Sequence, residues 1–240
     1  MAAIYVHSTQ KGASTMKFCY YGHACFLLDT GKEKLLFDPF LTDNPQASIK
    51  ADDAACDYIL LSHAHSDHFA DAPAIAERTG AEVIAIPEVI ALFPETVTHF
   101  HPMNIGGGWN FPFGRVTMVR AFHSCGAPGG APAGFVISFK EGPTVYYAGD
   151  TSLFSDMALI GKKFNIDYAI LPIGDNFTMG LEDAVQAAVL LKARHVIPVH
   201  YNTWPLIEQD PAQFQMFAAE EGIPVDIVKP GEELVLKTEK

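Results

Sequence analysis

The segment LLSHAHSDHFAD, residues 60–71, places three histidines and an aspartate within six positions, directly after an apolar run. Side chains of this kind fill an apolar core poorly, so their crowding at the end of an expected strand indicates that they converge on a ligand. His63 and His65 lie two residues apart and point to the same side of an extended segment. Asp67 and His68 follow where the chain turns into the next helix, and they approach the same point from another direction.

Imidazole and carboxylate groups are the ligands that zinc prefers, and manganese or iron can take their place. Three more residues of this type end other expected strands: His123 after RVTMVRAF, Asp150 after TVYYAG and His200 after HVIPV. Taken singly, Asp150 is equally explained as a helix cap and His200 as a loop hydrogen-bonding group. Together with the HxHxDH spacing, which scattered surface histidines would not produce, they favour a metal site on one rim of a sheet sandwich.

Seven candidate ligands are too many for one tetrahedral ion but suit two ions that share a bridging carboxylate and a water. We expect one ion to be held by three histidines: His63, His65 and His123. We expect the second ion to be held by three other residues: Asp67, His68 and His200. Asp150 is the expected bridge. Two ions ~3.5–4 Å apart would lower the pKa of a bound water toward ~7. The resulting hydroxide is a nucleophile at neutral pH.

The apolar pattern predicts a strand-rich first half and helix–strand alternation later. This order is typical of an α/β (α+β) αββα sandwich, in which two β-sheets are flanked by helices, in one domain over residues 16–240. Residues 1–15 are interpreted as a leader, and 104–111 as a glycine-rich turn. The expected helices are 71–80, 152–161, 181–193 and 211–221. The expected strands are 17–21, 24–29, 34–38, 57–61, 82–86, 115–123, 133–139, 144–150, 167–173, 195–200, 225–228 and 233–236.

Composition narrows the possible partners. The chain has 240 residues, 49% of them hydrophobic, and a formal net charge of −12, so a broad nucleic-acid surface is not expected. The four cysteines form no CxxC pair, and no apolar run is long enough to span a bilayer. We therefore expect a cytoplasmic protein with a small-molecule substrate, no membrane contact and the possibility of homo-oligomers.

Other polar residues are candidates for chemistry or binding. His23, in a Gly-His turn, is expected above the ions as a proton donor, and a packing role is the equal alternative. Two sets of polar residues that follow expected strands are candidates for contact with substrate. The first set is Asp175, Asn176 and Thr178, of which Asp175 or Thr178 can equally serve only to organise a turn. The second set is Asn202 and Thr203.

The motifs YGHACF, FDPFL, AFHS, YYAGDTSLFSDM, LPIGDNFTMGLEDA and VIPVHYNTWPLIEQDP, together with HxHxDH, give the chain its resemblance. From Met16 to the C-terminus it resembles the metallo-β-lactamase superfamily, and more narrowly a family of metal-dependent hydrolases related to the bacterial L-ascorbate-6-phosphate lactonases. The resemblance implies the αββα fold and a dinuclear ligand role for the seven residues named above. The loops that grip a β-lactam are not evident, so antibiotic hydrolysis is not implied.

These observations predict a hydrolase with two divalent ions, zinc first and Mn²⁺ or Fe²⁺ as alternatives. A metal-bound hydroxide would attack a small ester, lactone or phosphodiester, and Asp67 would orient the nucleophile. Two other enzymes remain open on the same scaffold: an iron-dependent oxidoreductase or dioxygenase, and a nucleic-acid phosphodiesterase. A binding module without catalysis is the third alternative, but such a module would be expected to have lost ligands, and all seven are present.

Overall fold

Two β-sheets pack face to face in the computed structural model, which describes residues 15–238. The predicted leader therefore lies outside the described residues, apart from Thr15. The first sheet has seven strands. Their spatial order is β13 (Glu233–Leu236), β1 (Met16–Gly22), β2 (Cys25–Asp29), β3 (Lys34–Phe37), β4 (Tyr58–Leu60), β5 (Glu82–Ala85) and β6 (Phe100–Pro102).

The second sheet has six strands, and it carries the helix–strand part of the chain. Its last three strands in chain order are parallel to one another, whereas its other neighbouring strands pair antiparallel. The spatial order is β12 (His195–Val199), β11 (Tyr168–Pro172), β10 (Thr144–Tyr147), β9 (Ala133–Phe139), β8 (Gly114–Arg120) and β7 (Gly108–Asn110).

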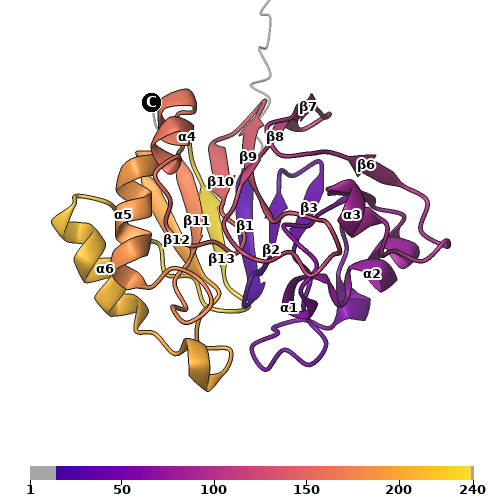
Figure 1. Ribbon diagram of the computed structural model, residues 1–240, viewed down its shortest axis with the longest axis horizontal. Coiled ribbons are helices and arrows are strands. Elements are labelled where there is room, and N and C mark those ends of the chain that lie inside the picture. The colour runs from indigo at the N-terminus through magenta and orange to yellow at the C-terminus, as the bar shows by residue number, and fades with distance from the viewer. Residues whose placement is uncertain (1–14, 239–240) are drawn as a thin grey trace, which may run out of the picture.

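Helices lie on both outer sides of the paired sheets, so the predicted αββα architecture is confirmed (Figure 1). Three of them flank the first sheet: α1 (Ser66–Phe69), α2 (Ala72–Thr79) and α3 (Pro87–Ile90). The other three cover the second sheet: α4 (Met157–Lys163), α5 (Leu181–Leu191) and α6 (Pro211–Glu220). Short 3-10 turns occur at Ala51–Asp53 and Pro205–Ile207.

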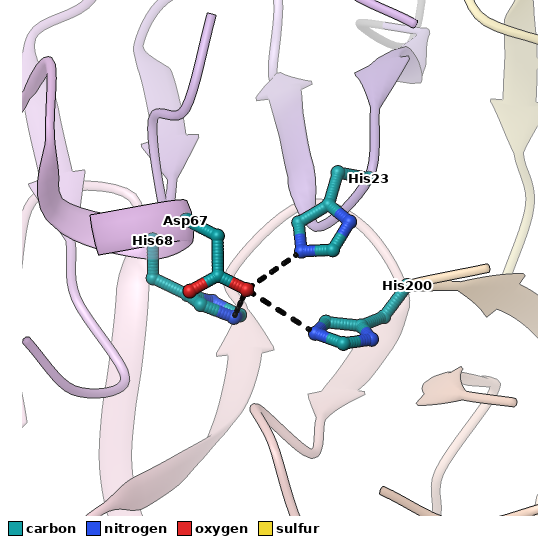
Figure 2. A group of neighbouring side chains, drawn as sticks. All are labelled: His23, Asp67, His68 and His200. Atoms are coloured by element: carbon teal, nitrogen blue, oxygen red, sulfur yellow. Dashed lines mark hydrogen bonds and ion pairs between the residues drawn. The ribbon is translucent and has the colours of Figure 1, made fainter. Parts of the chain in front are cut away.

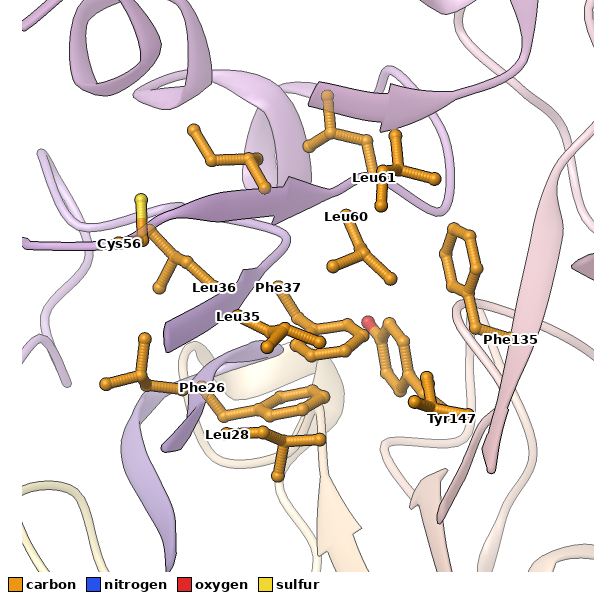
Figure 3. Close-up of a cluster of buried hydrophobic side chains, with 14 of the residues drawn as sticks. Phe26, Leu28, Leu35, Leu36, Phe37, Cys56, Leu60, Leu61, Phe135 and Tyr147 are labelled. Carbon is orange, nitrogen blue, oxygen red and sulfur yellow. The ribbon is translucent and has the colours of Figure 1, made fainter. Parts of the chain in front are cut away.

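The core has two layers because side chains alternate between the faces of each strand. On β10, Val145 and Tyr147 pack between the sheets, whereas Tyr146 packs under the helices of the second sheet. Figure 3 shows Tyr147 beside Phe26 and Phe37, with ring centroids 5.0 and 5.6 Å away. Burying each such aromatic side chain contributes about 1.5–3 kcal/mol, so this layer rigidly supports the strand ends.

Several predicted elements differ from the structure. The helix expected from residue 152 begins at Met157, because the Ser152 N–H donates to the Phe122 carbonyl and the Thr151 hydroxyl accepts from the Phe122 N–H instead. The strand expected at 225–228 is a single bridge at Val225, after which the chain turns away. The glycine-rich turn contains the short strand β7, whose backbone pairs with β8.

The directions of the strands distinguish one edge of the sandwich from the others. Strands β3, β4 and β5 are parallel to one another, and so are β10, β11 and β12. Carboxyl ends of parallel strands meet at one edge of a sheet, where the following loops can hold side chains close together. The loops after β3, β4, β10 and β12 carry Asp38, His63, Asp150 and His200.

Candidate metal centre

The first group of predicted ligands lies within metal-binding distance. One ligand atom from each of His63, His65 and His123 lies within 4.8 Å of the others. His63 and His65 turn Nε2 and Nδ1 toward each other at 3.0 Å. His123 comes from the loop after β8 rather than from its last residue, because that strand ends at Arg120. Its ring centroid is 5.3 Å from that of His63 and 5.0 Å from that of His65.

The second group assembles around one oxygen of Asp67, which α1 presents (Figure 2). His68 Nε2 is 3.7 Å and His200 Nε2 is 3.6 Å from Asp67 Oδ2. His23 joins this group, with Nε2 3.1 Å from the same oxygen. The sequence placed Asp67, His68 and His200 together as ligands and predicted His23 above the ions as a proton donor, not as a fourth member of this group.

Asp150 lies between the two groups. Its Oδ2 is 3.5 Å from His123 Nε2 and 3.2 Å from His200 Nε2. Its Oδ1 is 3.3 Å from His68 Nε2, and His63 Nε2 is 3.9 Å from Oδ2. One carboxylate thus contacts imidazoles of both groups, as a bridging ligand must.

The donor atoms fit metal ions better than they fit one another. His68 Nε2, His200 Nε2 and Asp150 Oδ1 are buried and have no hydrogen-bond partner. Buried polar atoms without partners are costly, at about 1–3 kcal/mol each. His68 Nε2 lies 3.3 Å from Asp150 Oδ1, and His200 Nε2 lies 3.2 Å from Asp150 Oδ2. Divalent cations would satisfy all of them at once, and imidazole and carboxylate are suitable donors.

The carboxylates hold protons on the imidazoles of the second group when no cation is present. Burial opposes the charge on His200, but the Asp150 carboxylate outweighs it and raises its pKa to about 9. Burial likewise opposes protonation of His68, yet Asp150 and Asp38 hold its pKa well above the usual value. Burial also opposes ionisation of Asp150, but His200 and His68 keep the pKa of that carboxyl well below its usual range. A metal ion would therefore displace protons from these rings.

The first group has the opposite tendency. Burial and the neighbouring His68 lower the pKa of His63 well below the usual value. Burial also lowers the pKa of His123, although Asp150 opposes this effect. Neutral imidazoles are the form that binds metal, so these two rings are ready to act as ligands.

Asp38 is a central residue that the sequence analysis did not single out. Its fully buried carboxylate accepts hydrogen bonds from His68 Nδ1 at 2.8 Å and from the Tyr147 hydroxyl at 2.6 Å. It also accepts from the backbone N–H and the hydroxyl of Ser62, and Ser62 Oγ in turn contacts His63 Nδ1 at 2.8 Å. Asp38 follows β3 directly, so the strand-end rule applied to the other ligands would have found it.

Thr151 forms hydrogen bonds that connect three loops of the centre. Its buried Oγ1 accepts from the backbone N–H of Phe122 at 2.9 Å, next to His123. Its carbonyl accepts from the N–H of Met179 at 3.1 Å, in the loop 174–180. Before it, Gly149 has φ +61, and a Cβ there would lie 2.8 Å from the Ala133 carbonyl. A larger residue would therefore push the Asp150 loop away from the neighbouring strand.

Three residues of the centre have positive backbone φ angles, which are unfavourable for residues other than glycine. The φ values are +58 for His23, +38 for Asp38 and +57 for His200. Such conformations cost on the order of 1–3 kcal/mol each and persist only where surrounding contacts hold them. Their concentration here marks the centre as a functional site.

The predicted substrate residues have different environments. Asp175 and Asn176 are exposed and Thr178 is half-buried. All three lie in the loop whose Met179 N–H donates to the Thr151 carbonyl. Asn202 is exposed, and its side chain accepts from the N–H of Gln209 at 2.7 Å. Their contact with substrate stays a prediction.

Thr203 contacts His23 on the side of the ring that faces away from Asp67. Thr203 is buried, and its hydroxyl is 2.7 Å from His23 Nδ1. Since the other ring nitrogen faces Asp67, both nitrogens of the buried His23 ring contact protein atoms. Neither residue is free to meet a substrate without losing one of these contacts.

All four cysteines are free and buried. Within residues 15–238, no helix has the length and apolar character needed to cross a membrane. His195, at the far end of β12 from His200, pairs with Asp226 at 3.0 Å and is remote from the centre.

Known proteins share this architecture and these motifs. A family model described as a beta-lactamase superfamily domain matches residues 25–201. A UPF0173 metal-dependent hydrolase of Natranaerobius thermophilus is 49% identical over 200 residues, covering 83% of this chain and 90% of that protein. One from Pelotomaculum thermopropionicum is 45% identical over 230 residues, covering 92% and 100%.

A solved structure extends the comparison to the fold. Igni18, a metallo hydrolase from the archaeon Ignicoccus hospitalis, superimposes with a TM-score of 0.87 at 34% identity, over 94% of this chain and all of that one. The resemblance predicted from the motifs is confirmed. The chain therefore belongs to the metallo-β-lactamase superfamily and, within it, to the UPF0173 metal-dependent hydrolases.

Proposed function

We propose that this metal-dependent hydrolase is dinuclear and cleaves a small ester, lactone or phosphodiester. The observation that carries the proposal is the position of Asp150, whose carboxylate lies 3.2–3.9 Å from ring nitrogens of both ligand groups. A mononuclear centre would leave one of the two groups without a cation, with buried donors unsatisfied.

The ligand assignment follows the two groups. One ion would be held by His63, His65 and His123. The other would be held by Asp67, His68 and His200. Asp150 would contact both, and zinc is the proposed metal, with Mn²⁺ or Fe²⁺ as alternatives. Bound in this way, two divalent ions supply Lewis acidity and a water with a pKa near ~7.

The chain's own residues would orient that water and admit the substrate. The Asp67 side chain is 22% exposed and that of His123 15%, whereas His68 and His200 are buried. The centre is therefore reached from the side of Asp67 and His123. We assign Asp67 the orientation of the attacking water, because its carboxylate can accept one of the water's protons while facing the opening.

A small substrate agrees with the charge of the chain. The net charge of −12 disfavours long polyanions, and therefore the nucleic-acid phosphodiesterase alternative. A cytoplasmic location and homo-oligomer formation stay proposals of the same kind.

The test combines metal content with turnover. Elemental analysis of the wild-type protein should find close to two divalent ions per chain, and a panel of lactones, esters, phosphodiesters and thioesters should reveal hydrolysis. Asp150→Ala should lose both metal and turnover, whereas His99→Ala, outside the centre, should keep both. Failure to bind metal after reconstitution would contradict the proposal. Bound iron with visible absorption and oxygen-dependent turnover would favour the oxidoreductase alternative.

A further inference from the structure

His23 occupies the position of an additional ligand. Figure 2 shows the imidazoles of His23, His68 and His200 pointing at one oxygen of Asp67. The three nitrogen–oxygen distances are 3.1, 3.7 and 3.6 Å, and one donor atom of each of the four residues lies within 4.8 Å of the others. Neighbouring donor atoms bound at about 2.0–2.2 Å to one four- or five-coordinate zinc ion lie about 2.8–3.8 Å apart. His23 therefore fits the same coordination sphere as the other three.

The contacts behind His23 favour the tautomer that binds metal through Nε2. Gln46 donates from Nε2 to the Tyr201 carbonyl at 3.2 Å, which turns its Oε1 toward Thr203 and the His23 backbone. That oxygen accepts from the Thr203 hydroxyl at 3.4 Å and from the His23 N–H at 3.2 Å. With its proton directed to Gln46, the Thr203 oxygen accepts from His23 Nδ1–H at 2.7 Å.

This arrangement directs a lone pair at a carboxylate. When Nδ1 carries the only ring proton, His23 Nε2 and Asp67 Oδ2 are two acceptors 3.1 Å apart. The ring is fully buried, so contacts with protein atoms rather than with water decide which of its nitrogens carries the proton. Two acceptors at this distance repel each other unless a cation lies beside both, which a shared metal ion would provide.

The backbone holds His23 rigidly in this position. Its φ of +58 is unfavourable for a histidine, yet its carbonyl accepts from the Tyr20 hydroxyl at 2.7 Å and from the N–H of His200 at 2.8 Å. The second bond joins His23 directly to another ligand of the same group. Strain maintained by several contacts is typical of a residue whose exact orientation matters.

We propose that His23, through Nε2, is an additional protein ligand, beside the bridging Asp150, of the ion held by Asp67, His68 and His200. The inference rests on the proposed dinuclear centre and gives His23 a role other than proton donor. It makes the two ions unequal, because this one has an additional imidazole and the ion of His63, His65 and His123 does not. The ion in the His23 site should be the more tightly bound.

The test is cobalt binding to wild-type, His23→Ala and His23→Gln proteins, measured by competition with a chelator and by visible absorption. Loss of a ligand should weaken the tighter site more than 100-fold and change the cobalt spectrum. Thr203→Val is the matched control for an indirect role, for which about 10- to 100-fold is typical. His99→Ala should behave as wild type.

The outcomes separate this inference from the proposed function. If wild type binds two ions and His23→Ala weakens binding no more than Thr203→Val, with an unchanged spectrum, His23 only hydrogen-bonds to Asp67 and the inference is wrong. If wild type binds no metal, the dinuclear proposal itself fails. Should the variants not fold, a crystal structure of the zinc-loaded wild type decides: Nε2 at about 2.0–2.1 Å from the ion supports the inference, and a hydrogen bond to Asp67 instead overturns it.

Discussion

His68 donates a hydrogen bond from Nδ1 to the Asp38 carboxylate at 2.8 Å, so Nε2, which faces Asp150, is the nitrogen that would bind a metal ion after losing its proton. The same carboxylate accepts the Tyr147 hydroxyl from the second sheet. With one carboxylate, Asp38 thus joins the two sheets and orients the ring of His68, a proposed ligand. Carboxylates behind ligating histidines commonly orient the ring and increase its basicity.

Asp38→Asn should therefore weaken metal binding without removing any ligand. The amide cannot accept from all four donors, so we expect about 10- to 100-fold lower affinity, measured by chelator competition. Tyr147→Phe removes only one of the hydrogen bonds and should cost about 1 kcal/mol of unfolding free energy with a smaller effect on affinity. Equal affinities for Asp38→Asn and wild type would show that His68 is oriented by other contacts.

Chelation should lower the melting temperature. Removing the ions leaves His68, His200 and Asp150 with buried atoms that have no partner. An ion present at about 100 times its dissociation constant stabilises the fold by about 2.7 kcal/mol, which corresponds to about 5–10 °C for a domain of this size. Zinc added back should restore the transition. An unchanged melting curve with metal loss confirmed would contradict a shared buried centre.

The metal-free protein should become less stable in alkali. In the folded state the pKa of His200 is about 9, above the ordinary histidine value of about 6.5, since Asp150 outweighs the burial that opposes the charge. This contribution is complete below about pH 6.5 and is lost as the pH rises through about 9, an effect on the order of 3 kcal/mol. Urea unfolding of chelated protein across this range measures it. A flat profile would show that His200 is neutral in the metal-free protein.

The opposite change is expected in acid. Burial lowers the pKa of His23 to about 3, so the unfolded chain takes up a proton near pH 6.5 that the folded chain excludes. Stability should fall as the pH decreases from about 6.5 toward about 3. Urea unfolding of His23→Gln should show a weaker acid dependence than wild type. The same slope in both proteins would assign the acid loss to other groups.

Thr151→Val should loosen the loops that carry His123 and Asp150. The substitution keeps the volume but leaves the Phe122 N–H without its acceptor, at a cost of about 1–3 kcal/mol. We expect lower metal content in the group that contains His123, measured by elemental analysis after dialysis. Thr151→Ser keeps the hydroxyl and should restore it. Loss in both variants would mean that the methyl group, rather than the hydrogen bond, is required.

Much of the centre could be predicted from the sequence because its ligands are local signals. His63, His65, Asp67 and His68 share one short segment, and the other ligands come at or just after strands with clear apolar patterns. The chemistry of imidazole and carboxylate then limits the possible partner to a borderline divalent metal. These features depend on residue type and short spacing, which the sequence displays directly.

Less predictable were the ends of elements near the site. The helix after Asp150 starts late, and His123 lies three residues beyond β8. Two hydrogen bonds compete with regular structure there, because Phe122 donates to the Thr151 hydroxyl and accepts from the Ser152 N–H. Propensity describes a residue and its near neighbours, whereas these bonds join loops from different strands.

The sequence by itself determined the fold class, the ligand types and the edge of the sandwich where they gather. Only the tertiary structure decided the supporting contacts, since Asp38 meets Tyr147 across 109 positions and His23 meets Thr203 across 180. The tertiary structure also determines the positive backbone φ angles of His23, Asp38 and His200, which no local sequence pattern indicates. Long-range contacts stabilise such conformations and orient each donor, and they exist only once both sheets have packed.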